Sequence, residues 1–135
     1  MEIIGHERAR EFLLKVEPEQ FPHTLLITGA AGVGKTTVAL AASARLIGCT
    51  PQQAETSPNI IRVTAGEDPK TGVPRAAIPV GTIRELRSLF YIQHAGPRII
   101  LIERAEELQQ ESANALLKIM EEPGAKLYFM ILARA

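Results

Sequence analysis

Glycine, lysine and threonine stand at a spacing that suits phosphate binding in the stretch GAAGVGKTT, residues 29–37. Gly29, Gly34, Lys35 and Thr36 fit the pattern of a nucleotide-phosphate loop. Glycines in such a loop let the backbone turn tightly and aim its N–H groups at phosphate oxygens. The lysine reaches the β and γ phosphates, and the threonine hydroxyl is placed to bind magnesium. The pattern therefore predicts binding of a nucleoside triphosphate with magnesium, without distinguishing kinases, GTPases and ATPases.

The remaining residues predicted to contact the nucleotide are Gly32 and Thr37, from the same stretch, and Glu103, which follows the apolar run RIILI. Glu103 is one methylene longer than aspartate, and it is either an outer-sphere partner of magnesium or a solvated charge at a strand end. Arg104 cannot act as a general base, because its guanidinium stays protonated at physiological pH. It pairs with a phosphate or with an acidic neighbour such as Glu106 or Glu107, or it is solvated. No catalytic residue is assigned.

The elements that would position these residues alternate along the chain. Apolar runs predict strands at 24–28, 59–63, 98–102 and 127–133, and helical spacing predicts helices at 5–20, 35–48, 82–93 and 109–122. Residues 64–79 are rich in glycine and proline and indicate a loop. Strands alternating with helices predict an α/β fold, a parallel sheet with helices on both faces. The predicted strand before the loop and helix after it are the context that a phosphate loop requires.

Length and composition limit the function classes. The chain has 135 residues, of which 46% are apolar and 22% charged, as expected for one folded domain. Fifteen basic residues balance fifteen acidic ones, so DNA contact would need a local patch or a larger assembly. A single cysteine, Cys49, excludes an internal disulfide and a cysteine-rich zinc site. No apolar run approaches membrane-spanning length, and we expect a cytoplasmic protein without membrane contact.

Four longer strings carry a family resemblance, and together they cover nearly the whole chain. They are IIGHERAREFL at 3–13, FPHTLLITGAAGVGKTT at 21–37, VGTIREL at 80–86 and ANALLKIMEEP at 113–123. In these strings the chain resembles the clamp-loader ATPases of the AAA+ class. The resemblance implies a P-loop NTPase fold of the AAA+ (RecA-like) kind that takes ATP with magnesium. It also implies the partners of that family: gamma/tau and delta subunits in a ring, the sliding clamp, and primed DNA reached through the assembly.

The sequence departs from the family pattern where chemistry is expected. Glu103 and Arg104 replace the motor's aspartate and glutamate, and Ala133, followed by Arg134, replaces the threonine that would sense the γ-phosphate. The departures favour a replication subunit that binds ATP but hydrolyses it poorly, a partner of the motor subunits. The alternative within the family is an active gamma/tau-like motor that uses Glu103. A more distant alternative is a small-molecule kinase, which would need an arginine-rich lid that residues 48–97 do not show.

Two further departures concern zinc and a helix cap. The family commonly has three more cysteines after the position of Cys49, and their absence here implies no zinc site. Gly81 replaces an aspartate that would cap the following helix. Because the chain stops on an apolar strand-like run, we expect residues 1–135 to be an AAA+ nucleotide-binding domain that lacks its last strand and lid.

The remaining residues of interest have structural roles or open ones. His6 either lies in the box that lines the adenine pocket of the family, with Ile3, Ile4 and Gly5, or is exposed. His23 and His94 are expected at the surface, and Cys49 as a small apolar filler at a helix end. The helix containing ANALLK should bury Ala113, Leu116, Leu117 and Met120, and leave Asn114 and Lys118 to a neighbouring subunit or to solvent.

Overall fold

A computed structural model describes residues 2–5, 11, 13, 15–30, 34–91, 96–121 and 127–134. Its sheet is wholly parallel, with strand order β1-β2-β5-β4-β3. The strands are β1 Glu2–Gly5, β2 Thr24–Thr28, β3 Ile60–Val63, β4 Arg98–Ile102 and β5 Leu127–Ala133. Parallel strands need covered faces, and the apolar runs from which most of these strands are built suit that requirement.

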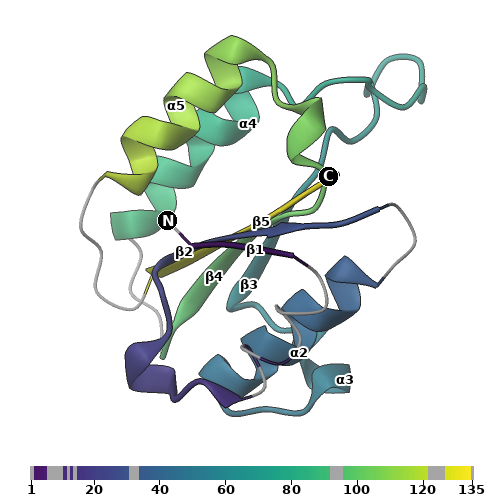
Figure 1. Cartoon of the computed structure of the whole chain (residues 1–135). Helices are drawn as coiled ribbons and strands as arrows, with labels where there is room; N and C mark the ends of the chain where they lie inside the picture. The colour runs from purple at the N-terminus through teal and green to yellow at the C-terminus, as the bar shows by residue number, and fades with distance from the viewer. Residues whose placement is uncertain are drawn as a thin grey trace.

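Helices cover both faces of the sheet and make a three-layer α/β fold (Figure 1). One face carries α2 Lys35–Ile47 and α3 Pro51–Ala54, and the other carries α4 Val80–Glu85 and α5 Gln110–Met120. The described residues also form three short 3₁₀ turns: η1 Pro18–Gln20, η2 Leu86–Tyr91 and η3 Ala105–Glu107. None of the helices in the described part of the chain is long and apolar enough to cross a membrane. The predicted α/β fold is confirmed.

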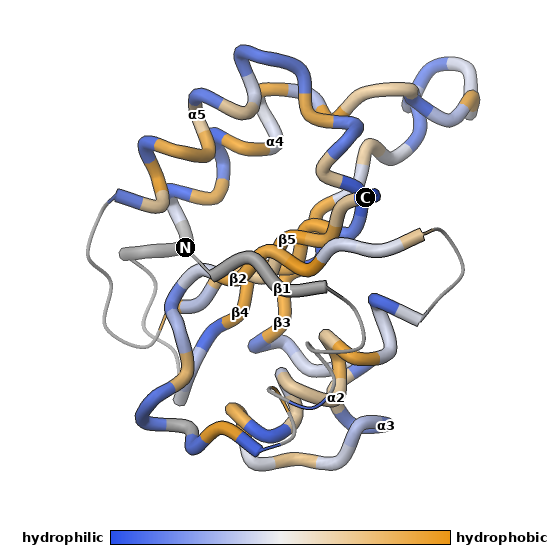
Figure 2. Tube along the Cα trace, in the orientation of Figure 1, coloured by the Kyte–Doolittle hydropathy of each residue, from blue (hydrophilic) through white to orange (hydrophobic). Residues whose placement is uncertain are grey.

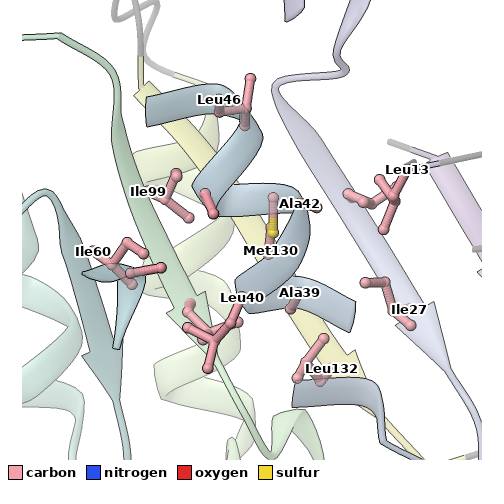
Figure 3. Close-up of a cluster of buried hydrophobic side chains, with 14 of the residues drawn as sticks. Leu13, Ile27, Ala39, Leu40, Ala42, Leu46, Ile60, Ile99, Met130 and Leu132 are labelled. Atoms are coloured by element: carbon pink, nitrogen blue, oxygen red, sulfur yellow. The ribbon is translucent and has the colours of Figure 1, made fainter. Parts of the chain in front are cut away.

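The apolar core consists of two layers, one on each side of the sheet, and the most hydrophobic stretches of the chain are its strands (Figure 2). Alternate residues of β4 and β5 serve opposite layers, as the two-residue period of a strand requires. Ile99, Leu101, Met130 and Leu132 belong to the layer beneath α2, which Figure 3 shows in close-up. Ile100, Ile102, Phe129 and Ile131 belong to the layer beneath α4 and α5. Because of this alternation, a side chain just past the end of a strand points toward α2 if it continues the row of residues that packs beneath α2.

The boundary between β2 and β5 is the point at which the order of the strands along the chain reverses. The connection from β2 runs through α2 on one face to the far edge strand β3. The chain later returns from β4 to β5 through α5 on the other face. In such sheets ligands bind outside the carboxyl ends of the strands at this point. Gly29, just after β2, donates its N–H to the Ala133 carbonyl at the end of β5, at 3.2 Å. The predicted phosphate loop therefore begins at this boundary.

The observed elements correct the sequence predictions mainly at the N-terminus. Gly5 lies in strand β1, beside Thr28 of β2, and not at the start of a helix. A helical conformation is found at residues 11, 13 and 15, within the predicted range. The predicted helix at 82–93 begins earlier, at Val80, and tightens into 3₁₀ geometry from Leu86. Ser88 donates its hydroxyl to the Glu85 carbonyl at 2.7 Å, a local bond that competes with the α-helical pattern.

Two expectations about helices were wrong in detail. In α5 the buried residues are Ser112, Leu116 and Ile119, whereas Leu117 is 48% exposed. Positions spaced by four and then three residues share one side of a helix, and Leu117 lies about 100° round from Leu116. The N-cap of α4 is Pro79, so Gly81 is inside the helix and does not occupy the cap. Asn114 and Lys118 are exposed, as predicted.

Candidate functional site

The phosphate-loop residues lie where strand β2 passes into helix α2. Gly34 is the N-cap of α2, and its left-handed backbone (φ 86°) is a conformation that glycine adopts without strain. The Gly34 carbonyl accepts the first helical hydrogen bond, from Val38 N–H at 3.0 Å. The N–H groups of the first turn of α2 lack helical partners and leave this end positively polarised. Gly32 lies outside the described residues.

Lys35 ties the loop to the sheet. Its Nζ donates to the Gly29 carbonyl at 2.6 Å and to the Ala133 carbonyl at 3.1 Å, and so joins the ends of β2 and β5. An ammonium group has three N–H donors, of which these two contacts use two. One donor therefore remains for an anion. Ala133, where the family pattern has a sensing threonine, takes part through its backbone only.

Glu103 is not a solvated charge, because Arg62 holds both of its carboxylate oxygens. Arg62 Nη2 donates to Oε1 at 2.5 Å, and Arg62 Nε donates to Oε2 at 3.2 Å. The pKa of the Arg62 guanidinium is raised above its ordinary value, chiefly by this hydrogen bond. Partial desolvation opposes the shift, and the negative charges of Glu103 and Glu55 add to it. The sequence pattern did not reveal this partner, because it depends on β3 lying beside β4.

Arg104 extends into solvent. Its side chain is 73% exposed, and its Nη1 lies 3.4 Å from Oε1 of Glu107, three residues later. A pair this exposed contributes little to stability. The sequence left open whether Arg104 pairs with an acidic neighbour or is solvated, and the structure shows both. The Arg104 side chain has no acceptor atom and cannot act as a general base.

Two adjoining depressions connect these residues. One has a volume of about 600 Å³ and is lined by Gly34, Lys35, Thr36, Glu103, Arg104, Glu106, Glu107 and Arg134. The other, of about 410 Å³, shares Thr36, Glu103, Arg104 and Glu107 with the first and extends to Val63, Thr64, Ala65, Gly66, Pro74 and Arg75. Both volumes are in the range of small-molecule sites. Thr36 and Glu103 thus line the same two depressions.

One predicted contact residue, Thr37, is exposed, and it lines a separate depression of about 150 Å³ beside α3 rather than the two that Thr36 lines. His23 is exposed, as expected, and its ring stacks on Tyr128. Ile3 and Ile4 lie in β1, while His6 and His94 fall outside the described residues.

The segment after Cys49 begins with a capping box. Thr50 Oγ1 accepts from Gln53 N–H at 3.2 Å, and Gln53 Oε1 accepts from Thr50 N–H at 3.0 Å. This arrangement starts the short helix α3, which we did not predict although the string TPQQ carries its signal. Cys49 itself is half-buried against the core, as expected for an apolar filler.

We expect protein purified without a histidine tag to contain no stoichiometric zinc, measured by elemental analysis. Structural zinc needs four ligands, mostly thiolate and imidazole. Within the described ranges, no three His, Cys, Asp or Glu side chains are grouped so that they could hold a metal ion. One zinc per chain that disappears on Cys49→Ser substitution would contradict this expectation.

The wholly parallel sheet with helices on both faces is the α/β fold of an AAA+ protein. The family model described as "DNA polymerase III, delta subunit" matches residues 5–135, and the chain belongs to that family of clamp-loader subunits.

Relatives and a solved structure agree with this assignment. The chain is 32% identical over 120 residues to "DNA polymerase III subunit delta'" of Yersinia pestis, covering 81% of the chain and 35% of the relative. It is 29% identical to "Replication factor C subunit 3" of Blastobotrys adeninivorans, covering 98% and 36% respectively. The crystal structure of a DNA polymerase III gamma subunit-related protein from Thermotoga maritima has the same fold. Its TM-score is 0.56 at 19% identity, covering 96% of this chain and 38% of that one. The chain thus spans about a third of the length of the relatives it matches.

Proposed function

We propose that residues 1–135 form AAA+ nucleotide-binding structure in a clamp-loader subunit of the delta-prime type. The subunit binds ATP at the phosphate loop and hydrolyses it poorly or not at all. Its work is to hold a place in a cytoplasmic ring with gamma/tau and delta subunits, which opens the sliding clamp and loads it onto primed DNA. Because fifteen basic and fifteen acidic residues cancel, the assembly as a whole supplies the attraction for DNA.

The observation that carries the proposal is the position of Lys35. Its ammonium joins the carbonyls of Gly29 and Ala133 and keeps one donor for a phosphate oxygen. The open end of α2 adds N–H donors and a positive dipole beside it. Gly34 and Arg134 line the same depression, so cationic and N–H groups meet where the triphosphate would lie.

The residues suit a magnesium ion only in part. The Thr36 hydroxyl is an oxygen donor of the kind magnesium accepts beside phosphate oxygens and water. A bound magnesium would neutralise charge on the β and γ phosphates. Glu103 lines the same depression but is paired with Arg62. Arg104 offers no acceptor to a water molecule, which supports weak hydrolysis.

The alternative is an active motor of the gamma/tau type, and one observation favours it. Glu103 lies in the same depressions as Thr36 and is a carboxylate, the group that positions water in many hydrolases. For it to act as base, its contacts with Arg62 would have to open. Turnover measurements separate the two proposals.

Lys35→Ala should weaken binding of a fluorescent ATP analogue by the intact protein at least about tenfold, the effect typical of losing a hydrogen bond to a charged group. Lys118→Ala is the matched control, because Lys118 is exposed in α5, on the opposite face of the sheet from α2. Fluorescence titration measures both. Equal affinity in the wild type and the Lys35→Ala variant would contradict the proposed nucleotide site.

A further inference from the structure

The Arg62–Glu103 pair differs in geometry from Arg84–Glu111 and Arg104–Glu107, and it is more buried than Arg84–Glu111. It is a two-point contact, with each carboxylate oxygen bonded to a different guanidinium nitrogen. The Glu103 side chain is only 18% exposed and that of Arg62 is 40% exposed. Arg84–Glu111, in contrast, has one contact at 3.2 Å between two largely exposed side chains. A two-point pair fixes the direction of the carboxylate, which a single exposed contact does not.

The sheet explains why Arg62 can reach Glu103. Arg62 and Leu101 are partners in the β3–β4 register, and Glu103 follows two residues beyond Leu101. Side chains two residues apart along a strand share a face, so Glu103 continues the row of Ile99 and Leu101 beneath α2. Ile60, two residues before Arg62, belongs to the same layer. Arg62 and Glu103 are therefore directed to the face that carries the phosphate-loop helix.

This placement puts the pair at the edge of the nucleotide site. Glu103 lines both depressions together with Thr36, whereas Arg62 lines neither. The positive charge beside the carboxylate offsets the negative charge that would attract a cation held at Thr36. Each carboxylate oxygen has another lone pair, but the guanidinium fixes the direction in which that lone pair points. The Glu103 carboxylate thus lines the site, while Arg62, which does not line it, offsets the charge of the carboxylate and fixes its orientation.

We propose that Arg62 is a positioning residue that withholds Glu103 from a magnesium ion at Thr36, so that nucleotide binds with little dependence on magnesium. This inference rests on the nucleotide binding proposed above and adds a property of the site. Cationic and N–H donors of Lys35 and the α2 terminus supply most of the affinity, and the divalent cation adds little. Removing Arg62 frees the Glu103 carboxylate to attract the cation.

The test compares nucleotide affinity with magnesium and with a chelator in the intact protein. The measured quantity is the dissociation constant with chelator divided by the dissociation constant with magnesium, each obtained by titrating a fluorescent ATP analogue. Arg62→Gln should raise this ratio about fivefold over the wild type, the upper range for a partly exposed charge pair. Arg62→Lys keeps the charge but cannot make the two-point contact, and should raise the ratio less. Arg84→Gln, which removes an exposed arginine of α4, is the matched control and should leave the ratio unchanged.

Glu103 must be the residue that responds. Arg62→Gln combined with Glu103→Gln should return the ratio to the wild-type value, because the carboxylate that the loss of Arg62 would free is no longer present. A wild-type ratio in both Arg62→Gln and Arg62→Lys, with binding that still depends on Lys35, would overturn this inference and leave the proposed function standing. A raised ratio that persists in the double variant would overturn it as well. The absence of any Lys35-dependent binding would overturn both this inference and the proposed function.

Discussion

ATP turnover by the intact protein should lie at least about a hundredfold below that of an active clamp-loader motor subunit measured in parallel. A positioned general base contributes roughly 10²–10⁴ in rate, and in our proposal Arg104 takes its place. The Arg104 side chain has no acceptor atom and extends into solvent. Glu103, the nearest alternative, has both oxygens engaged by Arg62. The measurement is phosphate release with and without clamp and primed DNA.

The Glu103→Gln variant makes this result diagnostic. If Glu103 takes no part in hydrolysis, its replacement leaves the low turnover unchanged. Glu106→Gln is the matched control, because Glu106 is an exposed carboxylate that lines the same depression. Robust turnover in the wild type that is lost in Glu103→Gln, but not in Glu106→Gln, would establish an active motor and contradict our proposal.

Leu116→Ala should lower the free energy of unfolding by about 2–5 kcal/mol, the range for removing a fully buried leucine side chain. Leu116 is 3% exposed and belongs to the layer between α5 and the sheet, with Ile119 and Phe129 among its members. Truncation would leave a cavity there that the surrounding side chains fill only in part. Chemical denaturation monitored by circular dichroism measures the change.

Leu117→Ala provides the control, because it makes the same substitution one residue away on the same helix. Leu117 is exposed, and surface substitutions usually change stability by no more than about 0.5 kcal/mol. If the two variants lose equal stability, the orientation of α5 described here is wrong. A Leu117→Ala loss that appears only in the assembled clamp loader would instead identify Leu117 as a subunit contact.

The local features of the site were predictable from the sequence. The glycine spacing of residues 29–37, with an apolar run before it and helical spacing after it, contains strand, loop and helix in one short segment. Such features depend on contacts between residues close in the chain, and so local pattern is enough. That Arg104 cannot act as a general base was also visible, because it follows from the residue type alone.

The tertiary structure alone decided which distant residues meet at the site. Lys35 contacts Ala133, which lies 98 residues away, and Arg62 contacts Glu103, which lies 41 residues away. Both contacts follow from strand order, which places β5 beside β2 and β4 beside β3. Local periodicity assigns a side chain to a face, but it carries no information on which strand lies next to which. The sequence therefore predicted the phosphate loop, and only the packing of the sheet placed Arg62 against Glu103, the carboxylate directly after RIILI.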